Sequence, residues 1–409
     1  MSKHQKFPKI VFVSPGYKPV PDVKGGAVEH LMTQLINENE KNPHFNFELY
    51  TIEDDELTNI QEYYKYTVIH QVKDFRKTFF LRSYSFLINI FYTLFKTDKR
   101  FNYLGLKVVR KLENDVTFIL VENDVNIFKQ IKNKTKNIPI VFHMHNDFDT
   151  FGEMQKNKDS MRFVVDNATE IWTVSKYLKR HLEDNFNTSK IKVFENCIDK
   201  ARFSICSTSN EKVTDYRNRY RISSNTFEIL YSGRLLPQKG VLELLNAVAM
   251  LPSDMDFKVV IAGEICNKKY EKKLLMAADK IKDKVVFTGY VPQYEIQTVY
   301  ASADLVVIPS QCQEAFCLVA MEATSLGKPC IVSKCGALVD VLNEKNSIFI
   351  ELGKDFEKKL AESIFSVFYD LKLRESMSKE SLILSQKFND EKDYFKNFCN
   401  LANEIIKEN

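Results

Sequence analysis

The sequence predicts an α/β fold made of two doubly wound domains, each built on a parallel sheet. Three observations support this prediction. Short apolar runs recur along the chain, they alternate with longer segments of helical periodicity, and most are continuously apolar. Continuously apolar strands are typical of parallel sheets that helices cover on both faces. A chain of 409 residues is also long enough for two domains that each bury a core.

The predicted strands fall into two groups separated by a polar stretch. The stretch 199–225 lacks strong periodicity, so we place the domain border there, with domains at 1–200 and 201–387 and a terminal helix at 388–409. The runs interpreted as strands are 10–14, 118–121, 138–143, 170–174 and 191–195 in the first domain, and 227–232, 258–262, 284–287, 304–308, 329–332 and 347–350 in the second.

The composition excludes several classes of protein. Apolar residues make up 44% and charged residues 27%, and a net charge of +4 is too small to indicate nucleic-acid binding. Eight cysteines are scattered without a Cys-x-x-Cys pair, and the two Cys-x4-Cys spacings have no histidine nearby. Reduced thiols are therefore expected rather than disulfides or zinc ligands. Residues 1–9 lack the apolar core of a signal peptide, so we expect a cytoplasmic protein.

A basic, aromatic segment at 73–111 leaves two interpretations open. Between residues 65 and 111 there are eleven Lys or Arg against two acids, and 79–95 is rich in aromatic and aliphatic residues. Such a composition is typical of an interfacial helix on an anionic membrane, here on the inner face of the plasma membrane. It is equally typical of a core helix with a solvated basic rim, because the apolar residues surround the helix almost completely.

Two places in the first domain carry residues that suit ligand binding. Gly25 and Gly26 precede a helical pattern, and free amides at a helix start favour a phosphate or another anion. A paired glycine is also common in simple turns. His143 and His145 follow an apolar strand, at the edge of an open α/β sheet where ligands bind. The nearby Asp-x-Asp pattern at 147–149 is short enough to arise by chance.

The second domain has a stronger combination. Gly233, Arg234 and Lys239 lie in a tight turn after strand 227–232, where two cations suit a diphosphate. A basic surface turn is the alternative. Glu314 precedes a helix expected to begin near 316, and Glu322 would lie about 12 Å away if the whole interval were helical. That separation matches a sugar–diphosphate–ribose span, although the helix dipole would favour two unrelated glutamates there as well.

These motifs together resemble those of the retaining glycosyltransferases of family four, the glycosyl transferases group 1, which have the GT-B fold. The resemblance runs nearly end to end and is strongest at Glu314-x7-Glu322 combined with Gly233-Arg234, Lys239-Gly240 and Gly327-Lys328-Pro329. It implies two Rossmann-like domains that face each other across a cleft. It also implies that the terminal helix crosses back to the first domain.

The resemblance assigns roles to individual residues. Arg234 and Lys239 would hold the donor diphosphate as it leaves, Glu322 would bind the ribose and Glu314 the donor sugar. His145 would lie near the reacting centre. The implied catalytic residues are His145, Arg234, Lys239 and Glu314. The implied donor-binding residues are Gly25, Gly26, Gly233, Arg234, Lys239, Tyr290, Glu314, Phe316, Cys317, Leu318 and Glu322.

The expected activity is a retaining, metal-independent hexosyl transfer from a nucleoside-diphosphate sugar, with UDP as the expected nucleotide. The expected acceptor is a lipid-linked glycan of cell-surface polysaccharide synthesis in bacteria, and no cofactor is expected. The sequence departs from the family pattern at Ala315 and Cys317, where Pro and Gly are usual, and at Cys197. A non-catalytic partner subunit of a glycosyltransferase and a nucleotide-sugar epimerase remain as alternative interpretations.

Overall fold

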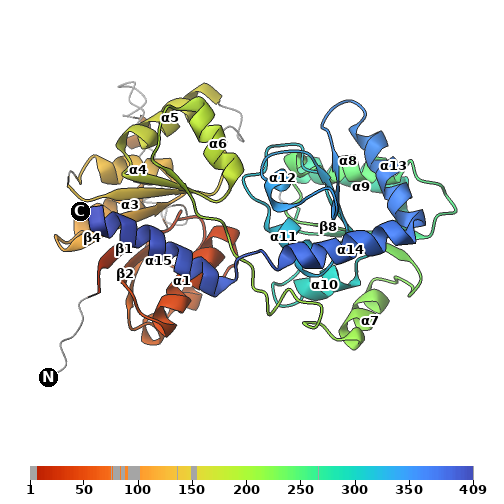
Figure 1. Ribbon diagram of the computed structural model, residues 1–409, viewed down its shortest axis with the longest axis horizontal. Coiled ribbons are helices and arrows are strands. Elements are labelled where there is room, and N and C mark those ends of the chain that lie inside the picture. The colour runs from red at the N-terminus through yellow and green to blue at the C-terminus, as the bar shows by residue number, and fades with distance from the viewer. Residues whose placement is uncertain are drawn as a thin grey trace. The chain divides into compact units, whose positions relative to one another are not determined.

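The chain forms two compact units, each with its own sheet (Figure 1). Unit 1 comprises Met1–Cys197 and Glu391–Asn409, and unit 2 comprises Ile198–Asp390. This computed structural model describes residues 7–74, 76, 83, 88–90, 102–135, 137–148, 154–265 and 267–408. Each border between the units lies three residues from the position predicted from the sequence.

Unit 1 is built on a seven-stranded parallel sheet with the strand order β3-β2-β1-β4-β5-β6-β7. The order reverses between β1 and β4, so the carboxyl ends of these two central strands lie at the switch point of a doubly wound sheet. The strands are β1 (Lys9–Val13), β2 (Asn46–Ile52), β3 (Thr67–Val72), β4 (Val116–Glu122), β5 (Ile140–Met144), β6 (Glu170–Thr173) and β7 (Ile191–Val193).

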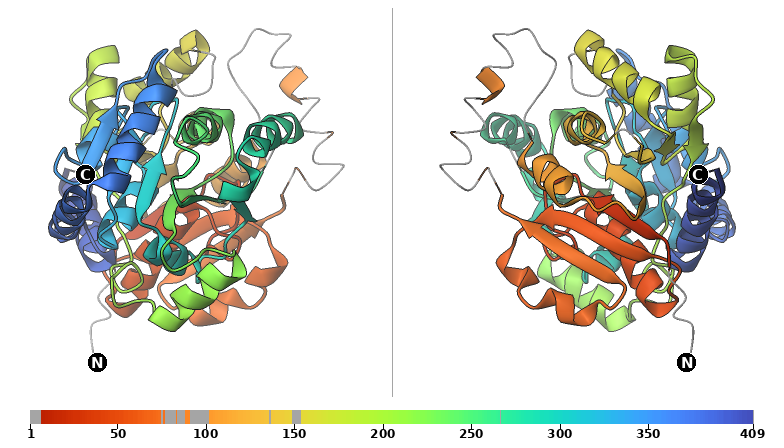
Figure 2. Two further views of the ribbon diagram at one scale, coloured as in Figure 1. Left: turned by 90° about the vertical axis from the view of Figure 1, so that its right-hand side faces the viewer. Right: turned by 90° about the vertical axis from the view of Figure 1, so that its left-hand side faces the viewer.

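Strands β2 and β3 were not among the predicted strands. Polar residues interrupt both, as Glu48 does in β2, and β3 is an edge strand whose middle residues are partly exposed. Glu48 is nevertheless paired, because Lys9 and His70 reach it from the neighbouring strands. The red and orange strands at this end of the sheet are visible in the right-hand view of Figure 2.

Two helices of unit 1, α4 and α6, start within three residues of the strand before them. Asp124 caps the first turn of α4, and Ser175 does the same for α6, so each chain reversal is stabilised by a side chain that accepts a hydrogen bond from a free amide. The helices are α1 (Ala27–Lys41), α3 (Tyr103–Lys111), α4 (Val125–Lys132), α5 (Met154–Asn167), α6 (Lys176–Asn185) and α15 (Glu391–Glu408), with 3-10 turns at Asp55–Leu57 and Ile60–Tyr63.

The terminal helix α15 completes the core of unit 1. It lies beside α1 (Figure 1) and buries one apolar face against the sheet. Tyr394 stacks on Phe194 with ring centroids 4.3 Å apart, and Phe398 contacts Trp172 edge-on. Removing α15 would therefore expose the inner face of the sheet.

Unit 2 is built on a six-stranded parallel sheet with the strand order β10-β9-β8-β11-β12-β13. Its strands are β8 (Phe227–Ser232), β9 (Phe257–Ala262), β10 (Val285–Gly289), β11 (Leu305–Ile308), β12 (Cys330–Ser333) and β13 (Ser347–Ile350). Its helices are α7 (Asn210–Arg219), α8 (Val241–Val248), α9 (Lys268–Asp279), α10 (Ile296–Ser302), α11 (Leu318–Ser325), α12 (Leu338–Val341), α13 (Phe356–Tyr369) and α14 (Leu371–Ser385), with 3-10 turns at Pro237–Lys239 and Lys282–Lys284.

Helices cover both faces of this second sheet. One core cluster joins the strands to α8, α9 and α13, and another joins them to α7, α10 and α11. Because helices cover both faces, the strands are mostly apolar, with Glu228 and Lys258 as charged exceptions, and this is the pattern that predicted them. The prediction of two parallel α/β sheets covered by helices is confirmed.

The basic, aromatic segment remains largely outside the described residues. Of residues 79–95 the structure describes only 83 and 88–90, while Tyr103–Lys111 forms α3. The choice between a membrane-contacting helix and a core helix therefore stays a prediction. Among the helices that the structure describes, none combines the length and the apolar character needed to cross a bilayer.

Candidate functional site

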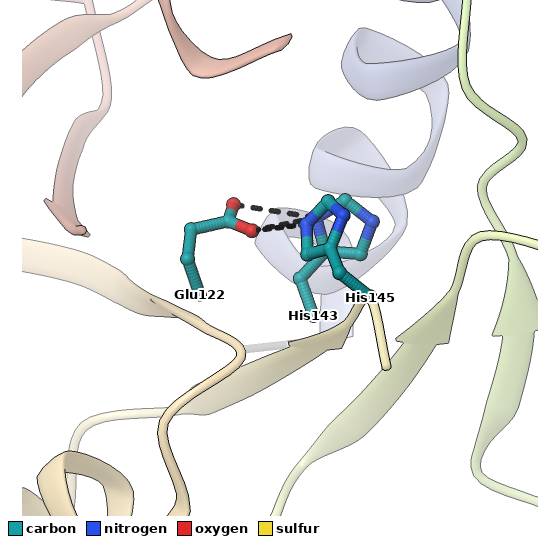
Figure 3. A group of neighbouring side chains, drawn as sticks. All are labelled: Glu122, His143 and His145. Carbon is teal, nitrogen blue, oxygen red and sulfur yellow. Dashed lines mark hydrogen bonds and ion pairs between the residues drawn. The ribbon is translucent and has the colours of Figure 1, made fainter. Parts of the chain in front are cut away.

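A buried cluster of one carboxylate and two imidazoles lies where β4 and β5 end in unit 1 (Figure 3). Glu122 is the last residue of β4 and is paired in register with His143 of β5. His145 follows β5 immediately, and its Nε2 lies 2.6 Å from Glu122 Oε2. His143 Nδ1 lies 3.0 Å from the same oxygen and 3.1 Å from His145 Nε2. Parallel pairing thus brings Glu122 to two histidines that lie 21 and 23 residues further along the chain.

The cluster is ionised at the carboxylate and not at His145. Burial alone would raise the pKa of Glu122, but the electrostatic interaction with His143 and the hydrogen bonds that both rings donate outweigh it and hold that pKa at about 2. Burial and the neighbouring His143 lower the pKa of His145 to about 4. At neutral pH His145 is therefore an uncharged imidazole beside a carboxylate.

The loop after β5 is fixed from both sides. Asn123 has a left-handed backbone, and its side-chain oxygen accepts hydrogen bonds from the amides of His145 and Asn146 at 2.9 and 3.1 Å. Asp147 is buried and accepts a hydrogen bond of 2.6 Å from Tyr177 of α6. The first carboxylate of the Asp-x-Asp pattern is thus buried and already hydrogen-bonded within the protein. Asp149 lies outside the described residues.

The glycine pair of unit 1 lies at the start of α1, as predicted. Gly25 and Gly26 both have positive φ, 66° and 121°, and Gly26 is the residue that precedes the helix. The carboxylate of Glu29 folds back over this end, since a Cβ on Gly26 would lie 2.3 Å from Glu29 Oε2. An anion bound here would have to displace Glu29 or share a proton with it.

In unit 2, the turn after β8 presents the predicted cations. Gly233 has a φ of 143°, and Arg234 is exposed. Within the described residues the Arg234 guanidinium makes no hydrogen bond or ion pair, and its carbonyl accepts from Tyr231, so the charge of the side chain is available to a ligand. Lys239 ends the following 3-10 turn, and Gly240 then starts α8 with a φ of 73°.

Lys239 and Glu314 form an ion pair across two strand ends. Lys239 Nζ lies 2.6 and 2.8 Å from the two carboxylate oxygens of Glu314, and Ser310 donates a third hydrogen bond to that carboxylate. Burial opposes the charge on Lys239, but Glu314 outweighs it and raises the pKa of the ammonium group. The Lys239 side chain keeps 26% of its surface exposed, so it can donate to a ligand without leaving Glu314.

Two glycines hold the loop that carries Glu314. A Cβ on Gly240 would lie 1.7 Å from the carbonyl oxygen of Pro309. A Cβ on Gly336, which follows β12, would lie 2.2 Å from Glu314 O and 2.4 Å from Glu314 N. The amide of Ala337 donates to Glu314 O at 2.7 Å. Backbone-to-backbone contact on both sides therefore sets the position of Glu314, and no residue with a side chain fits at either glycine.

The second glutamate lies on a helix that begins later than predicted. Helix α11 starts at Leu318 rather than near 316, so half of the interval between Glu314 and Glu322 is loop, and the separation estimated for a fully helical interval does not apply. Glu322 accepts a hydrogen bond of 2.7 Å from Tyr300. Because the first amides of a helix have no partner inside it, those at the start of α11, including the amide of Leu318, face the region before the helix.

Cys317 occupies a position whose backbone suits glycine. Its φ of 132° is far from the values that side-chain-bearing residues prefer, and it stands directly before α11 next to the partly buried Phe316. Burial and the nearby Glu314 raise the pKa of its thiol, which is therefore uncharged at neutral pH. The cysteine contributes a neutral side chain where the family pattern has none.

Tyr290 follows β10 directly and is 63% exposed. It stands at the same edge of the sheet as the turn after β9, since the amide of Gly263 donates to the carbonyl of Gly289. An exposed ring at a strand end is available for stacking on a base.

Sequence reasoning missed four residues of these clusters. Glu122 could have been noticed as a charged residue that ends an apolar strand, but nothing linked it to the histidines. Ser310, Tyr300 and Gly336 have no local signal, because their partners lie elsewhere in the chain.

Comparison with known proteins first defines the class. The structure of Anabaena Alr3699/HepE in complex with UDP and glucose matches with a TM-score of 0.76 at 18% identity, covering 97% of this chain and 100% of that one. At this identity the likeness concerns the fold, and it defines the chain as a GT-B protein with two Rossmann-like domains. The predicted fold class is confirmed.

The family follows from the sequence matches. Residues 212–382 match the family Glycosyl transferases group 1. A lipopolysaccharide 1,2-N-acetylglucosaminetransferase of Salmonella typhimurium is 29% identical over 54% of this chain and 55% of its own length. An uncharacterized glycosyltransferase of Methanocaldococcus jannaschii is 36% identical over 45% of this chain and 47% of its own length. The chain spans about half the length of these two relatives. These matches support a group 1 glycosyltransferase, with the family match itself confined to residues 212–382.

Proposed function

We propose that the protein is a retaining glycosyltransferase that moves a hexosyl group from a nucleoside-diphosphate sugar, with UDP as the nucleotide, to a glycan. The observation that carries this proposal is the Lys239–Glu314–Ser310 cluster beside the exposed Arg234, inside the segment that matches the family. A structural neighbour of this chain was solved with UDP and glucose, which supports UDP as the nucleotide.

In this proposal Arg234 and Lys239 bind the diphosphate. The bond between the anomeric carbon and the phosphate oxygen breaks, and its electron pair leaves with the nucleoside diphosphate. The acceptor oxygen then bonds to the same carbon on the same face, and its proton passes to the departing phosphate. Two fixed cations stabilise the charge that develops on the leaving group, which is the main contribution asked of the protein.

Glu314 has two roles in this arrangement. Its carboxylate holds Lys239 in one place and keeps it charged, and its remaining acceptor capacity is available to sugar hydroxyls. Glu322 is proposed to bind the ribose, with Tyr300 orienting its carboxylate. We propose that no metal takes part, because the two cations supply the charge that a divalent ion supplies in other transferases.

We propose a lipid-linked glycan of cell-surface polysaccharide synthesis as the acceptor. Two observations support this: a relative is named as a lipopolysaccharide transferase, and the segment 73–111 is basic and aromatic. Flotation with vesicles of anionic and of neutral lipid tests the membrane contact. Binding to anionic vesicles that is lost at high salt is expected, and failure to float at low salt would remove this part of the proposal.

The donor is tested by thermal-shift measurements with UDP, GDP, dTDP, ADP and their sugar conjugates. A ligand at 100 times its dissociation constant stabilises the folded state by about 2.7 kcal/mol. We expect one nucleotide to stabilise the protein, with the response reduced in Glu322→Ala. Conversion of the nucleotide-sugar into its epimer without any acceptor would favour an epimerase. No binding to any nucleotide would favour a non-catalytic partner subunit.

Retention and metal independence have their own measurements. NMR of the product gives the configuration of the new bond, and an inverted anomeric centre would refute the retaining assignment. Transfer measured after treatment with a chelator is expected to continue at the untreated rate. A rate that falls and returns with a divalent ion would refute metal independence.

A further inference from the structure

The contacts within the Glu122–His143–His145 cluster determine which nitrogen of each histidine ring carries a proton, a question that the proposed function leaves open. Three atoms meet there, Glu122 Oε2, His145 Nε2 and His143 Nδ1, at mutual separations of 2.6, 3.0 and 3.1 Å (Figure 3). Each ring nitrogen either carries a proton or offers a lone pair. The surroundings decide which, because an ionised carboxylate can only accept.

The proton on His143 is located by its other nitrogen. His143 Nε2 is buried and has no hydrogen-bond partner in the part of the chain that the structure describes. The ring packs against Phe194 and Trp172, with centroids 5.2 and 6.4 Å away. A proton on Nε2 would be a donor without an acceptor in this apolar environment, which is costly. The proton therefore lies on Nδ1 and is donated to Glu122.

The proton on His145 is located by the carboxylate. A bare Nε2 would place its lone pair 2.6 Å from an oxygen of Glu122 that also carries lone pairs, so this nitrogen must be the donor. His145 Nδ1 is then left as a lone pair. The amide of His145 donates to Asn123, which fixes the backbone. The side chain of His145 is 6% exposed, so the ring has limited access to solvent.

A metal ion is the alternative for such a group, since these three are the candidate metal ligands among the described residues. Tetrahedral zinc with bonds of about 2.0–2.1 Å separates its ligand atoms by roughly 3.3 Å. The separation of 2.6 Å between His145 Nε2 and Glu122 Oε2 is much shorter and is typical of a charge-assisted hydrogen bond. The geometry therefore favours protons between these groups rather than a metal.

We propose that Glu122 and His143 are positioning residues that hold His145 with its proton on Nε2, so that its Nδ1 accepts a hydrogen bond from a hydroxyl of a sugar bound at this edge of the unit 1 sheet. This inference rests on the proposed function for the identity of the ligand. The tautomer itself does not, because it follows from the cluster alone. A sugar hydroxyl can donate or accept, so the tautomer sets the direction of this hydrogen bond: with Nδ1 unprotonated, the hydroxyl donates to it.

The tautomer is measured by long-range nitrogen–proton NMR on protein labelled with ¹⁵N-histidine. The chain has seven histidines, and the His145→Gln and His143→Phe variants assign the two relevant signals. At neutral pH we expect His145 protonated on Nε2 alone and His143 on Nδ1 alone. A His145 protonated on Nδ1, or on both nitrogens, would overturn the proposal.

Glu122→Gln tests the cause. Both rings donate to the same oxygen, Oε2, and His143 Nδ1 also lies 3.2 Å from Oε1. The amide of glutamine therefore either turns its NH2 towards both donating nitrogens, or accepts with its oxygen in the place of Oε2 and sets its NH2 against the Nδ1 proton of His143. At least one ring is expected to shift its proton to the other nitrogen. The matched control is Glu170→Gln, a buried carboxylate of the same sheet that bonds Trp172 and Lys192 instead. An unchanged tautomer of both rings in Glu122→Gln would overturn the proposal, even if this variant is less stable.

Two further readouts separate the proposal from its alternatives. Transfer by Glu122→Gln is expected to fall about two- to tenfold, the size of one hydrogen bond, with Glu170→Gln unchanged. Stoichiometric metal in the purified protein, lost in Glu122→Gln, would replace the proposal by a metal site. If the wild-type protein transfers no sugar at all, the proposed function fails, and the NMR measurement still decides the tautomer.

Discussion

Replacing Gly336 by alanine tests whether the position of Glu314 depends on backbone contact. The new Cβ would lie 2.2 and 2.4 Å from the backbone O and N of Glu314, whereas ordinary contact begins at 3.4 Å. Glu314 must therefore move by about 1 Å, because the atoms nearest the new Cβ are backbone atoms and not the end of a flexible side chain. A displacement of this size at a reacting group costs on the order of 10²-fold in rate.

The control for this change is Gly353→Ala. Gly353 also has a positive φ, 149°, but no atom lies within 4 Å of the added Cβ. Both variants carry backbone strain of about 1–3 kcal/mol, and only Gly336→Ala displaces Glu314. Thermal unfolding measures the strain, and the rate of sugar transfer and the nucleotide thermal shift measure the site. A folded Gly336→Ala protein with wild-type turnover would refute the reasoning.

Three other predictions concern the charged and strained residues. Arg234→Ala is expected to lower turnover by about 10²–10³ with little change in melting temperature, and an unchanged turnover would contradict its role at the diphosphate. Cys317→Gly is expected to be more stable than Cys317→Ala by about 1–3 kcal/mol, because both remove the thiol and only glycine relieves the strain at a φ of 132°; equal unfolding free energies would contradict this. The lowered pKa values of Glu122 and His145 mean that the unfolded chain binds more protons, so their stabilising effect is lost as the pH falls from about 6.5 towards 2. Burial raises the pKa of Glu228 to about 7, so its effect has the opposite sign: stability is lost as the pH rises from 4.5 to about 7. Urea unfolding gives the free energy of unfolding of Glu228→Gln and of the wild type. The value for the variant minus the value for the wild type is therefore expected to be larger at pH ~8 than at pH ~5. An equal difference at the two pH values would contradict the titration of Glu228 near neutral pH.

Two buried carboxylates, Glu122 in unit 1 and Glu228 in unit 2, illustrate how the surroundings decide whether a carboxylate is ionised. Glu122 is surrounded by hydrogen-bond donors and is ionised, whereas Glu228 is buried beside Asp304, and its partners Ser302 and Arg217 do not offset the loss of water. Both follow apolar runs or stand within them, and nothing in the local sequence distinguishes them. Only the partners that the fold supplies separate an ionised carboxylate from one that titrates near neutral pH.

Much of the fold could be predicted because apolar strands carry their own signal. Eleven runs marked strands of the two sheets, while β2 and β3 escaped because Glu48 and the exposed middle of β3 interrupt the pattern. The terminal helix showed its apolar face directly, since Tyr394, Phe398 and Ala402 recur at helical spacing. These elements could be predicted because the spacing of their apolar residues is visible within a short stretch of the sequence.

The sequence by itself determined which residues stand at strand ends, and hence that His145, Arg234, Lys239 and Glu314 lie at the carboxyl edges of their sheets, which is where open α/β sheets generally bind ligands. The tertiary structure alone decided how they are paired. Lys239 and Glu314 are 75 residues apart, yet their atoms meet at 2.6 Å because β8 and β11 are neighbours and glycine lets the loops approach. Pairing of this kind depends on strand order and on single ångströms of backbone position, and neither is encoded in the spacing of residues along the chain.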